Sequence, residues 1–204
     1  MILKAVDSVP FQQVVRGMRP VRSIWLAGPE PWLPDAEAQA ARQRAFCADN
    51  GFTGLTAPAI VETQADNVEV QARELYAERM AKLRQADAGI INLTPFRGPS
   101  CASAAAFEAG VLAGLGRPLM AYVNVADESE AEYVDRVEVH VGAQRDEHGV
   151  WRDGDGCVVE DFGLPETLML WAEARRLFVI ITDNPLHDLT GLEMCLEALA
   201  LYAE

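Results

Sequence analysis

The feature that most constrains the fold of this sequence is the alternation of short apolar runs with longer segments of helical pattern. Short apolar runs bounded by glycine or proline are typical of strands that are buried on both faces. The expected strands are SIWLAG (23–28), FTGLTAP (52–58), AGIINLTP (88–95), PLMAYVNV (118–125) and LFVIITD (177–183). Strands that alternate with helices are joined by right-handed crossovers, so we expect an α/β fold with a parallel sheet between helices.

The segments between these runs predict the helices and one surface excursion. Helical patterns cover 34–51, 67–87, 101–115, 129–137 and 189–204. The segment LPETLMLWAEARR (164–176) leads into the last strand, and the polar, glycine-rich stretch 138–161 is expected to lie on the surface. With 204 residues and neither an internal repeat nor a long linker, the chain suits one domain over 23–204, preceded by an extension over 1–22.

Composition limits the classes of partner. The formal net charge of -14 argues against nucleic acid and against an anionic membrane surface. No apolar segment reaches the roughly 20 residues of a membrane helix, and the first residues do not resemble a secretory signal. Four widely spaced cysteines without a CxxC pair favour free thiols in a reducing cytoplasm. The remaining classes of binding partner are a small-molecule substrate and another protein.

The sequence lacks several motifs that mark common activities of α/β proteins. Gly28 is followed by Pro-Glu-Pro, so no GxGxxG follows the first strand, and GxSxG and P-loop motifs are also absent. The three histidines share no helical spacing with one another or with a cysteine, so we expect neither a metal site nor a cofactor. Ligands of such folds bind where loops leave the carboxyl ends of the strands. The unusual loops there are AGPEPWLPD, TPFRGPSCAS and the segment before LPETLML.

Glu108 is a single carboxylate within an alanine-rich, otherwise apolar helix. The helical positions i−4, i+3 and i+7 are Ala104, Val111 and Leu115, so the side chain is expected to project from an apolar stripe. One interpretation places Glu108 at the edge of that stripe, pointing into water. The other places it in a pocket of low dielectric near the loop after the third strand.

Three motifs give the chain a resemblance to a known family. WLAGPEPWLPDA, ADAGIINLTPFRGPS followed by AAFEAG, and EDFGLPETLML resemble the nucleoside 2-deoxyribosyltransferases and related nucleoside and nucleotide N-glycosidases, in order and approximate spacing. The resemblance covers about residues 23–202. It implies a flavodoxin-like three-layer sandwich of about five parallel strands, with helices on both faces, and an enzyme that cleaves the N-glycosidic bond of a nucleoside.

The resemblance also assigns a role to Glu108, which matches the glutamate nucleophile of the family. That glutamate attacks the anomeric carbon of the sugar, expels the base and forms a covalent glycosyl enzyme, which a second base or water resolves. A buried carboxylate needs hydrogen-bond donors to stay ionised. Backbone amides at the helix start, with Ser100 or Ser103, are the donors expected from the sequence.

Four positions depart from the family pattern. Ala102 stands where the transferases carry aspartate, Arg79 where they carry asparagine or aspartate, and Trp25 where a tyrosine steadies the nucleophile. Thr167 stands where a neighbouring subunit supplies asparagine to the sugar, although Met169 is retained. The candidate substrate-binding residues are Trp25, Gly28, Arg79, Phe96, Arg97, Ser100, Ala102, Ser103, Thr167 and Met169.

Three functions are therefore compatible with the sequence. The first is a deoxyribosyltransferase-like enzyme, and the second is an N-glycosidase of nucleoside 5′-monophosphates in which Arg79 or Arg97 balances the phosphate. The third is a nucleoside- or nucleotide-binding protein without catalysis. Trp25, Trp32 and Phe96 are candidates for stacking on a base. The resemblance further implies a homo-oligomer in which the 164–169 segment of a neighbouring subunit completes the site.

Overall fold

A six-stranded sheet forms the centre of the molecule in the computed structural model, which describes residues 2–7, 21–60 and 67–202. The strand order is β1-β8-β5-β4-β2-β3. The strands are β1 (Ile2–Asp7), β2 (Ser23–Ala27), β3 (Thr53–Thr56), β4 (Ala88–Asn92), β5 (Leu119–Val125) and β8 (Ala174–Ile181). Strands β3, β2, β4, β5 and β8 run parallel. This order is that of the flavodoxin-like fold, so the predicted fold class is confirmed.

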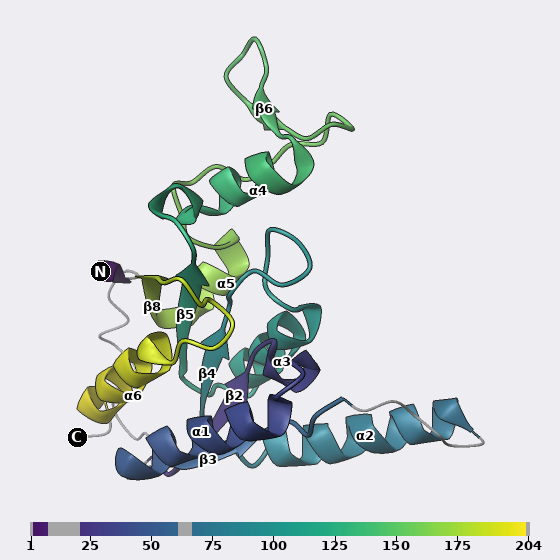
Figure 1. Cartoon of the computed structure of the whole chain (residues 1–204), viewed down its shortest axis with the longest axis vertical. Helices are drawn as coiled ribbons and strands as arrows, with labels where there is room; N and C mark the ends of the chain where they lie inside the picture. Colours follow the sequence, from purple (N-terminus) through teal and green to yellow (C-terminus); the bar gives the residue numbers. More distant parts are fainter. Residues whose placement is uncertain (1, 8–20, 61–66, 203–204) are drawn as a thin grey trace.

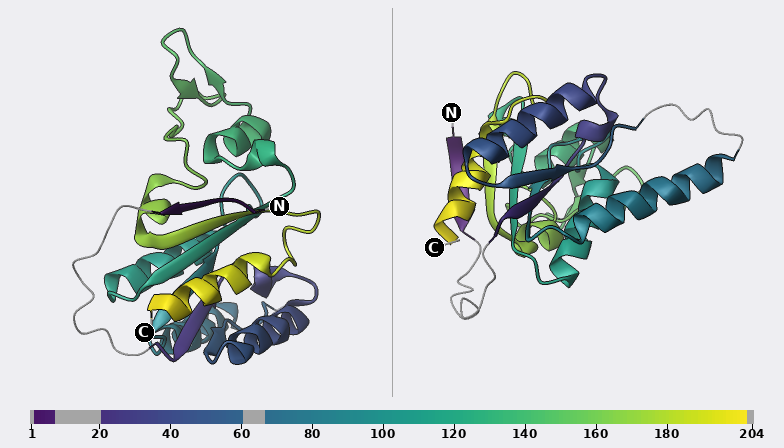
Figure 2. Two further views of the ribbon diagram at one scale, coloured as in Figure 1. Left: turned by 90° about the vertical axis from the view of Figure 1, so that its left-hand side faces the viewer. Right: turned by 90° about the horizontal axis from the view of Figure 1, so that it is seen from below.

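Helices cover both faces of this sheet (Figures 1 and 2). They are α1 (Ala36–Asp49), α2 (Val68–Leu83), α3 (Ser103–Gly114), α4 (Tyr133–Val141), α5 (Leu168–Glu173) and α6 (Thr190–Tyr202), with short 3-10 turns η1 (Glu30–Trp32) and η2 (Glu128–Glu130). α1 and α6 pack on one face through Cys47, Leu192 and Leu196. α3, α5 and the last turn of α2 pack on the other, and they enclose a second apolar core.

The two cores explain why the strands read as continuous apolar runs. In β2, Ile24 and Leu26 face the core beneath α1 and α6, whereas Trp25 and Ala27 face the core beneath α3. Every residue of β4 and of β5 is buried. Alternate side chains of β2, β4 and β5 thus enter different cores, so these inner strands have no polar face that would interrupt the apolar run in the sequence.

Part of the N-terminal extension adds a strand that the sequence did not predict. β1 pairs antiparallel with β8, from Ile2 opposite Ile180 to Asp7 opposite Arg176. It therefore covers the edge of the sheet that β8 would otherwise expose. Residues 1 and 8–20 of the extension lie outside the described residues.

The segment before the last strand differs from its predicted bounds. α5 spans only Leu168–Glu173, and β8 begins at Ala174, three residues before the expected start at Leu177. Ala174 already pairs with Leu119 of β5, with a register shift before the next pair. Parallel pairing with β5 therefore overrides the helical pattern that continues in the sequence.

The 138–161 excursion begins as helix and continues as a small ribbon that projects from the body (Figure 1). α4 extends to Val141 and ends at Gly142, whose φ of 72° is a left-handed conformation that suits glycine. The ribbon pairs β6 (Gln144–Arg145) with β7 (Trp151–Arg152). No described helix is long and apolar enough to cross a membrane.

The ribbon contains a short structural repeat, although the sequence analysis identified none. Asp146 Oδ1 accepts hydrogen bonds from the amides of His148 and Val150. Seven positions later, Asp153 Oδ1 accepts the equivalent bonds from Asp155 and Cys157. Aspartate side chains of this kind stabilise turns by bonding to the backbone two residues on, so both turns belong to the scaffold of the ribbon.

Candidate active site

Glu108 lies on the buried side of α3, with only 2% of its surface exposed. The buried residues of this helix are Ala105, Glu108, Ala109 and Leu112. The predicted stripe was wrong, since Ala104 and Val111 are half-buried and Leu115 is 46% exposed. Glu108 nevertheless faces the core, because the neighbours that share its face are at i−3, i+1 and i+4.

Two side chains donate hydrogen bonds to the Glu108 carboxylate. Trp25 Nε1 donates to Oε2 at 3.1 Å, and Arg79 Nε donates to Oε1 as part of an ion pair. The expected donors were different, since Ser100 bonds elsewhere and Ser103 is exposed. Both oxygens of the carboxylate are therefore held by N–H donors, in a position away from water.

Trp25, at the position where the resemblance implies a tyrosine, donates a hydrogen bond to Glu108 from its indole nitrogen. The residue is fully buried in β2, where parallel neighbours on both sides fix its backbone opposite Leu55 and Gly89. Its indole N–H is a donor only, so it supports Glu108 as an acceptor and offers no proton acceptor in return. The departure from tyrosine therefore preserves a donor to the carboxylate.

Arg79 brings a cation to the site from the last turn of α2. Its side chain is 15% exposed, and its guanidinium carbon lies 5.6 Å from the centre of the Trp32 ring. Nη2 is buried and has no hydrogen-bond partner among the described residues. The substitution of arginine for asparagine or aspartate therefore places a positive charge, with a spare donor, beside the carboxylate.

Two aromatic rings from different loops meet next to this arginine. The ring centres of Trp32, in η1 after β2, and Phe96, in the loop after β4, are 5.9 Å apart. Arg97 is exposed, has a φ of 60°, and holds its guanidinium carbon 4.8 Å from the Phe96 ring centre. The loops after the first and third parallel strands thus converge, as ligand sites of this fold require.

A second buried carboxylate, Glu30, was not identified from the sequence. Its Oε1 accepts hydrogen bonds from Asn92 Nδ2 at 2.8 Å and Gln43 Nε2 at 2.9 Å. Its Oε2 lies where a side chain at Gly28 would sit, since a Cβ there would be 2.1 Å away. Burial raises the pKa of Glu30 above its ordinary value, while the two amides and its own backbone lower it and the charge of Glu108 raises it further. Gly28 therefore makes room for a carboxylate.

A third polar cluster joins the loop before α3 to the segment before α5. Glu166 Oε1 accepts from Ser100 Oγ at 3.2 Å and from the Thr167 amide at 2.9 Å. Glu166 Oε2 lies 3.5 Å from Arg136 Nη2, and both side chains are almost completely buried. Burial is the main cause that raises the pKa of Glu166. Arg136 also donates to the carbonyl of Pro99 at 2.8 Å, so it ties α4 to the same loop.

The remaining predicted residues lie around these clusters without bonding to Glu108. Ala102 is buried at the start of α3, and Thr167 is half-buried at the start of α5. Met169 is 73% exposed on α5. Among the described residues, no group of three or more histidine, cysteine or acidic side chains is placed to hold a metal ion.

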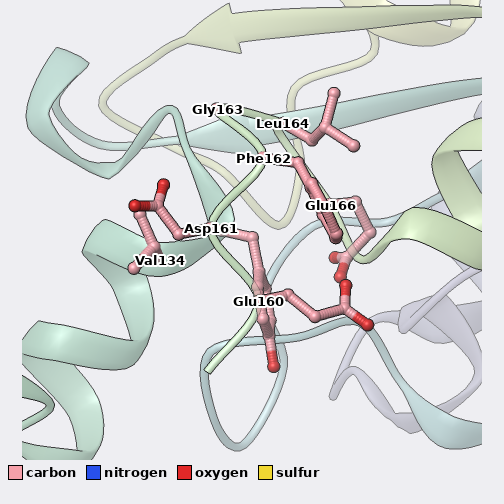
Figure 3. A pocket seen from close by; sticks show the side chains of 8 residues that line it. Val134, Glu160, Asp161, Phe162, Gly163, Leu164 and Glu166 are labelled. Carbon is pink, nitrogen blue, oxygen red and sulfur yellow. The ribbon is translucent and has the colours of Figure 1, made fainter. Parts of the chain in front are cut away.

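A small pocket lies between α4 and residues 160–166, the segment before α5 (Figure 3). Its lining residues are Tyr133, Val134, Glu160, Asp161, Phe162, Gly163, Leu164 and Glu166. It shares Glu166 with the third cluster and has no wall formed by Glu108 or by its two donors. This pocket is therefore distinct from the surroundings of Glu108.

Comparison with known proteins identifies the family. The profile described as Nucleoside 2-deoxyribosyltransferase matches residues 24–169. A 2-desoxiribosyltransferase from Leishmania mexicana has a similar structure, with a TM-score of 0.54, 29% sequence identity, and coverage of 73% of this chain and 85% of its own. A 2-deoxyribosyltransferase from Bacillus psychrosaccharolyticus is more distant, with a TM-score of 0.39, 17% identity, and coverage of 50% of this chain and 72% of its own. Curated proteins gave no match.

The matched region contains Glu108, Trp25 and Arg79, the first two motifs, and all of the third motif except its last residue, Leu170. Since the profile spans more than half of the chain, the chain belongs to the nucleoside 2-deoxyribosyltransferase family and is an enzyme of this N-glycosyl-transferring class.

Proposed function

We propose that this protein cleaves the N-glycosidic bond of a nucleoside, with Glu108 as the nucleophile. The observation that carries the proposal is a carboxylate only 2% exposed that two N–H donors, Trp25 and Arg79, hold in a fixed orientation. Burying an ionised group is costly unless it is paired, so a structural role alone would be met equally well by an apolar side chain. The cost is understandable if the anion performs chemistry.

The proposed reaction has two displacements at one carbon. A Glu108 oxygen attacks the anomeric carbon while the bond to the base breaks, and a second base or water then releases the sugar from the resulting ester. Developing positive charge on the sugar is stabilised by the carboxylate more strongly in a site that excludes water. The aromatic pair of Trp32 and Phe96 lies beside Arg79 and offers flat apolar surface for a base.

The sugar needs access to a carboxylate that is only 2% exposed. Arg79 is the more exposed of the two partners of Glu108, and it belongs to a helix that extends away from the body (Figure 2). All residues of that helix from 68 to 78 are exposed except the half-buried Gln71. The sugar therefore reaches Glu108 at a lower cost from the Arg79 side than past Trp25, which lies inside the sheet.

We further propose that the enzyme is a homo-oligomer in which the 164–169 segment of one subunit completes the site of its neighbour. Met169 and Leu168 are 73% and 39% exposed in the single chain, although both are apolar. A mixing experiment tests this arrangement. Glu108→Ala and Met169→Glu should each lose activity alone, and mixed subunits should regain part of it, because some sites combine two intact segments. A monomer with full activity would contradict the arrangement.

An N-glycosidase of nucleoside 5′-monophosphates remains the second candidate, and Arg97 favours it. The guanidinium of Arg97 is exposed beside Phe96, whereas Arg79 is already engaged with Glu108. Arg97 can therefore bind a phosphate on a ligand that stacks at the aromatic pair. Preference for monophosphates that disappears in Arg97→Gln would support this substrate class over unphosphorylated nucleosides.

The deciding experiment incubates the protein with a panel of ribo- and deoxyribonucleosides and their monophosphates, with and without a second base. Chromatography then measures free base and exchanged nucleoside. Release or exchange should disappear in Glu108→Ala and persist in Glu193→Ala, which alters an exposed glutamate on α6. Binding without any release of base would leave only the non-catalytic function.

A further inference from the structure

Glu108 and its two donors, Trp25 and Arg79, form the Glu108 cluster. Within this cluster, Arg79 has a buried N–H donor that makes no hydrogen bond to a described residue. Its Nε donates to Glu108 Oε1, yet its Nη2 is buried and has no partner among the described residues. A guanidinium presents its N–H groups in a fixed planar fork, so the direction of the spare donor is set once Nε is bound. An unpartnered buried donor is uncommon, because leaving it unsatisfied costs free energy.

The environment of the guanidinium indicates which part of a ligand would meet that donor. One side of Arg79 is occupied by the nucleophile, and the Trp32 ring, itself in contact with Phe96, lies 5.6 Å from the guanidinium carbon. A nucleoside whose sugar carbon faces Glu108 carries its base on that same carbon. The aromatic pair beside Arg79 is then the surface on which that base can stack.

The charges of the site change in a way that gives Arg79 a second partner. Before the reaction, Glu108 carries the negative charge and Arg79 compensates it. When a Glu108 oxygen bonds to the sugar carbon, the carboxylate becomes a neutral ester and the electron pair of the broken bond goes to the base nitrogen. The negative charge thus moves from one partner of the guanidinium to the other side of the scissile bond.

We propose that Arg79 binds the departing base through Nη2 and stabilises it as an anion, so that no acid has to protonate the base before it leaves. The inference rests on the proposed function of Glu108. Net charge in the cluster is the same before and after the first step, and the base takes its proton from the water or the incoming base that completes the reaction. A single guanidinium thereby serves both the nucleophile and the leaving group.

This arrangement selects a class of bases. A guanidinium offers only donors, so it recognises carbonyl oxygens and ring nitrogens that carry negative charge. Bases such as uracil, thymine and hypoxanthine delocalise the charge of departure onto carbonyl oxygens. Cytosine carries an amino group in place of one of the two carbonyl oxygens of uracil, and adenine carries one in place of the carbonyl oxygen of hypoxanthine, so each offers the guanidinium one fewer acceptor for that charge. The favoured substrates are therefore nucleosides of the carbonyl-rich bases.

The test compares two substrates that differ only in the acidity of the base, deoxyuridine and its 5-fluoro derivative. Their kcat/KM ratio is measured within each preparation, so the amount of folded protein cancels. In Arg79→Gln the rate with deoxyuridine should fall by about 100-fold or more, as for loss of one preorganised donor, and the fluorinated substrate should lose much less. Arg79→Lys should lie between, and added guanidinium should restore deoxyuridine cleavage in Arg79→Ala.

The matched control is Arg73→Gln, which removes an arginine of the same helix that is 78% exposed and pairs with Glu69. Its substrate ratio should equal that of the wild-type protein. An equal loss on both substrates in Arg79→Gln would overturn the inference, since it would show that Arg79 only positions Glu108. Absence of base release in the wild-type protein would instead overturn the proposed function, and the inference with it.

Discussion

Trp25 and Glu108, 83 positions apart in the sequence, are joined by a buried hydrogen bond of 3.1 Å from the indole nitrogen to the carboxylate. The bond links the middle of β2 to the middle of α3 across the apolar core that they share. It orients one oxygen of the carboxylate, while Arg79 engages the other. A strand, a helix and a helix end therefore define the position of a single anionic group.

Trp25→Phe should destabilise the protein by about 1–3 kcal/mol, because a buried carboxylate oxygen loses its donor while most of the ring volume is kept. Cleavage activity should fall as well, since the orientation of Glu108 is released. The control is Trp171→Phe, because the Trp171 indole nitrogen has no hydrogen-bond partner among the described residues. Urea denaturation measures both variants. Equal losses would show that ring packing, and not the hydrogen bond, matters at Trp25.

Gly28→Ala should destabilise the protein by about 1–3 kcal/mol or more, because the new Cβ overlaps a packed group. That Cβ would lie 2.1 Å from Glu30 Oε2 and 2.7 Å from the Asn92 Cβ, so the buried amide and carboxylate network has to shift. Gly110→Ala is the matched control without overlap. Gly110 is exposed inside α3, and a Cβ added there would have no atom within 4 Å. It should stabilise by about 0.5–1 kcal/mol through helix propensity. Thermal unfolding of both variants checks the contrast.

Glu30→Gln should change how stability depends on pH. Burial raises the pKa of Glu30 in the folded protein above its ordinary value of 4.5. The folded state then binds the proton more tightly than the unfolded state, so this group favours folding below pH 4.5 and the benefit is lost as pH rises through the folded pKa. Relative to wild type, the variant should gain stability across that interval. A pH-independent difference in urea midpoint would contradict the assigned burial.

Arg136→Met should destabilise the protein by about 3–5 kcal/mol, because it leaves Glu166 buried without its cation. The comparison is Arg145→Met, which breaks the exposed ion pair with Asp161 and should cost about 1 kcal/mol or less. Chemical denaturation measures both. If Arg136→Met were as mild as Arg145→Met, the buried pair would not hold the loop before α3 against the segment before α5.

The sequence predicted the central parallel strands because a strand that is buried on both faces is a continuous run of apolar residues. β4 and β5 consist only of buried residues, and their apolar runs are visible without knowledge of any partner. β1 is different, since it pairs on one side only and its partner β8 lies far along the chain. Nothing near Ile2–Asp7 in the sequence indicates that pairing.

The candidate site was predicted less completely than the fold. The face of α3 was misassigned because its alanines, glycines and leucines are apolar around most of the helix, so spacing carries little information about which side is buried. Glu30 and Arg136 are charged residues whose partners lie 62 and 30 positions away. Their burial depends on those distant partners, and a single sequence does not show them. Arg79 was named as a candidate, but its pairing with Glu108 required the fold.

The most direct measurement of the central claim is mass spectrometry of the protein quenched during turnover of a deoxyribonucleoside, followed by peptide mapping. We expect a mass increase equal to one deoxyribosyl group, confined to the peptide that contains Glu108 and absent from Glu108→Gln. Base release without any such adduct, or an adduct on another peptide, would contradict the assignment of Glu108 as the nucleophile.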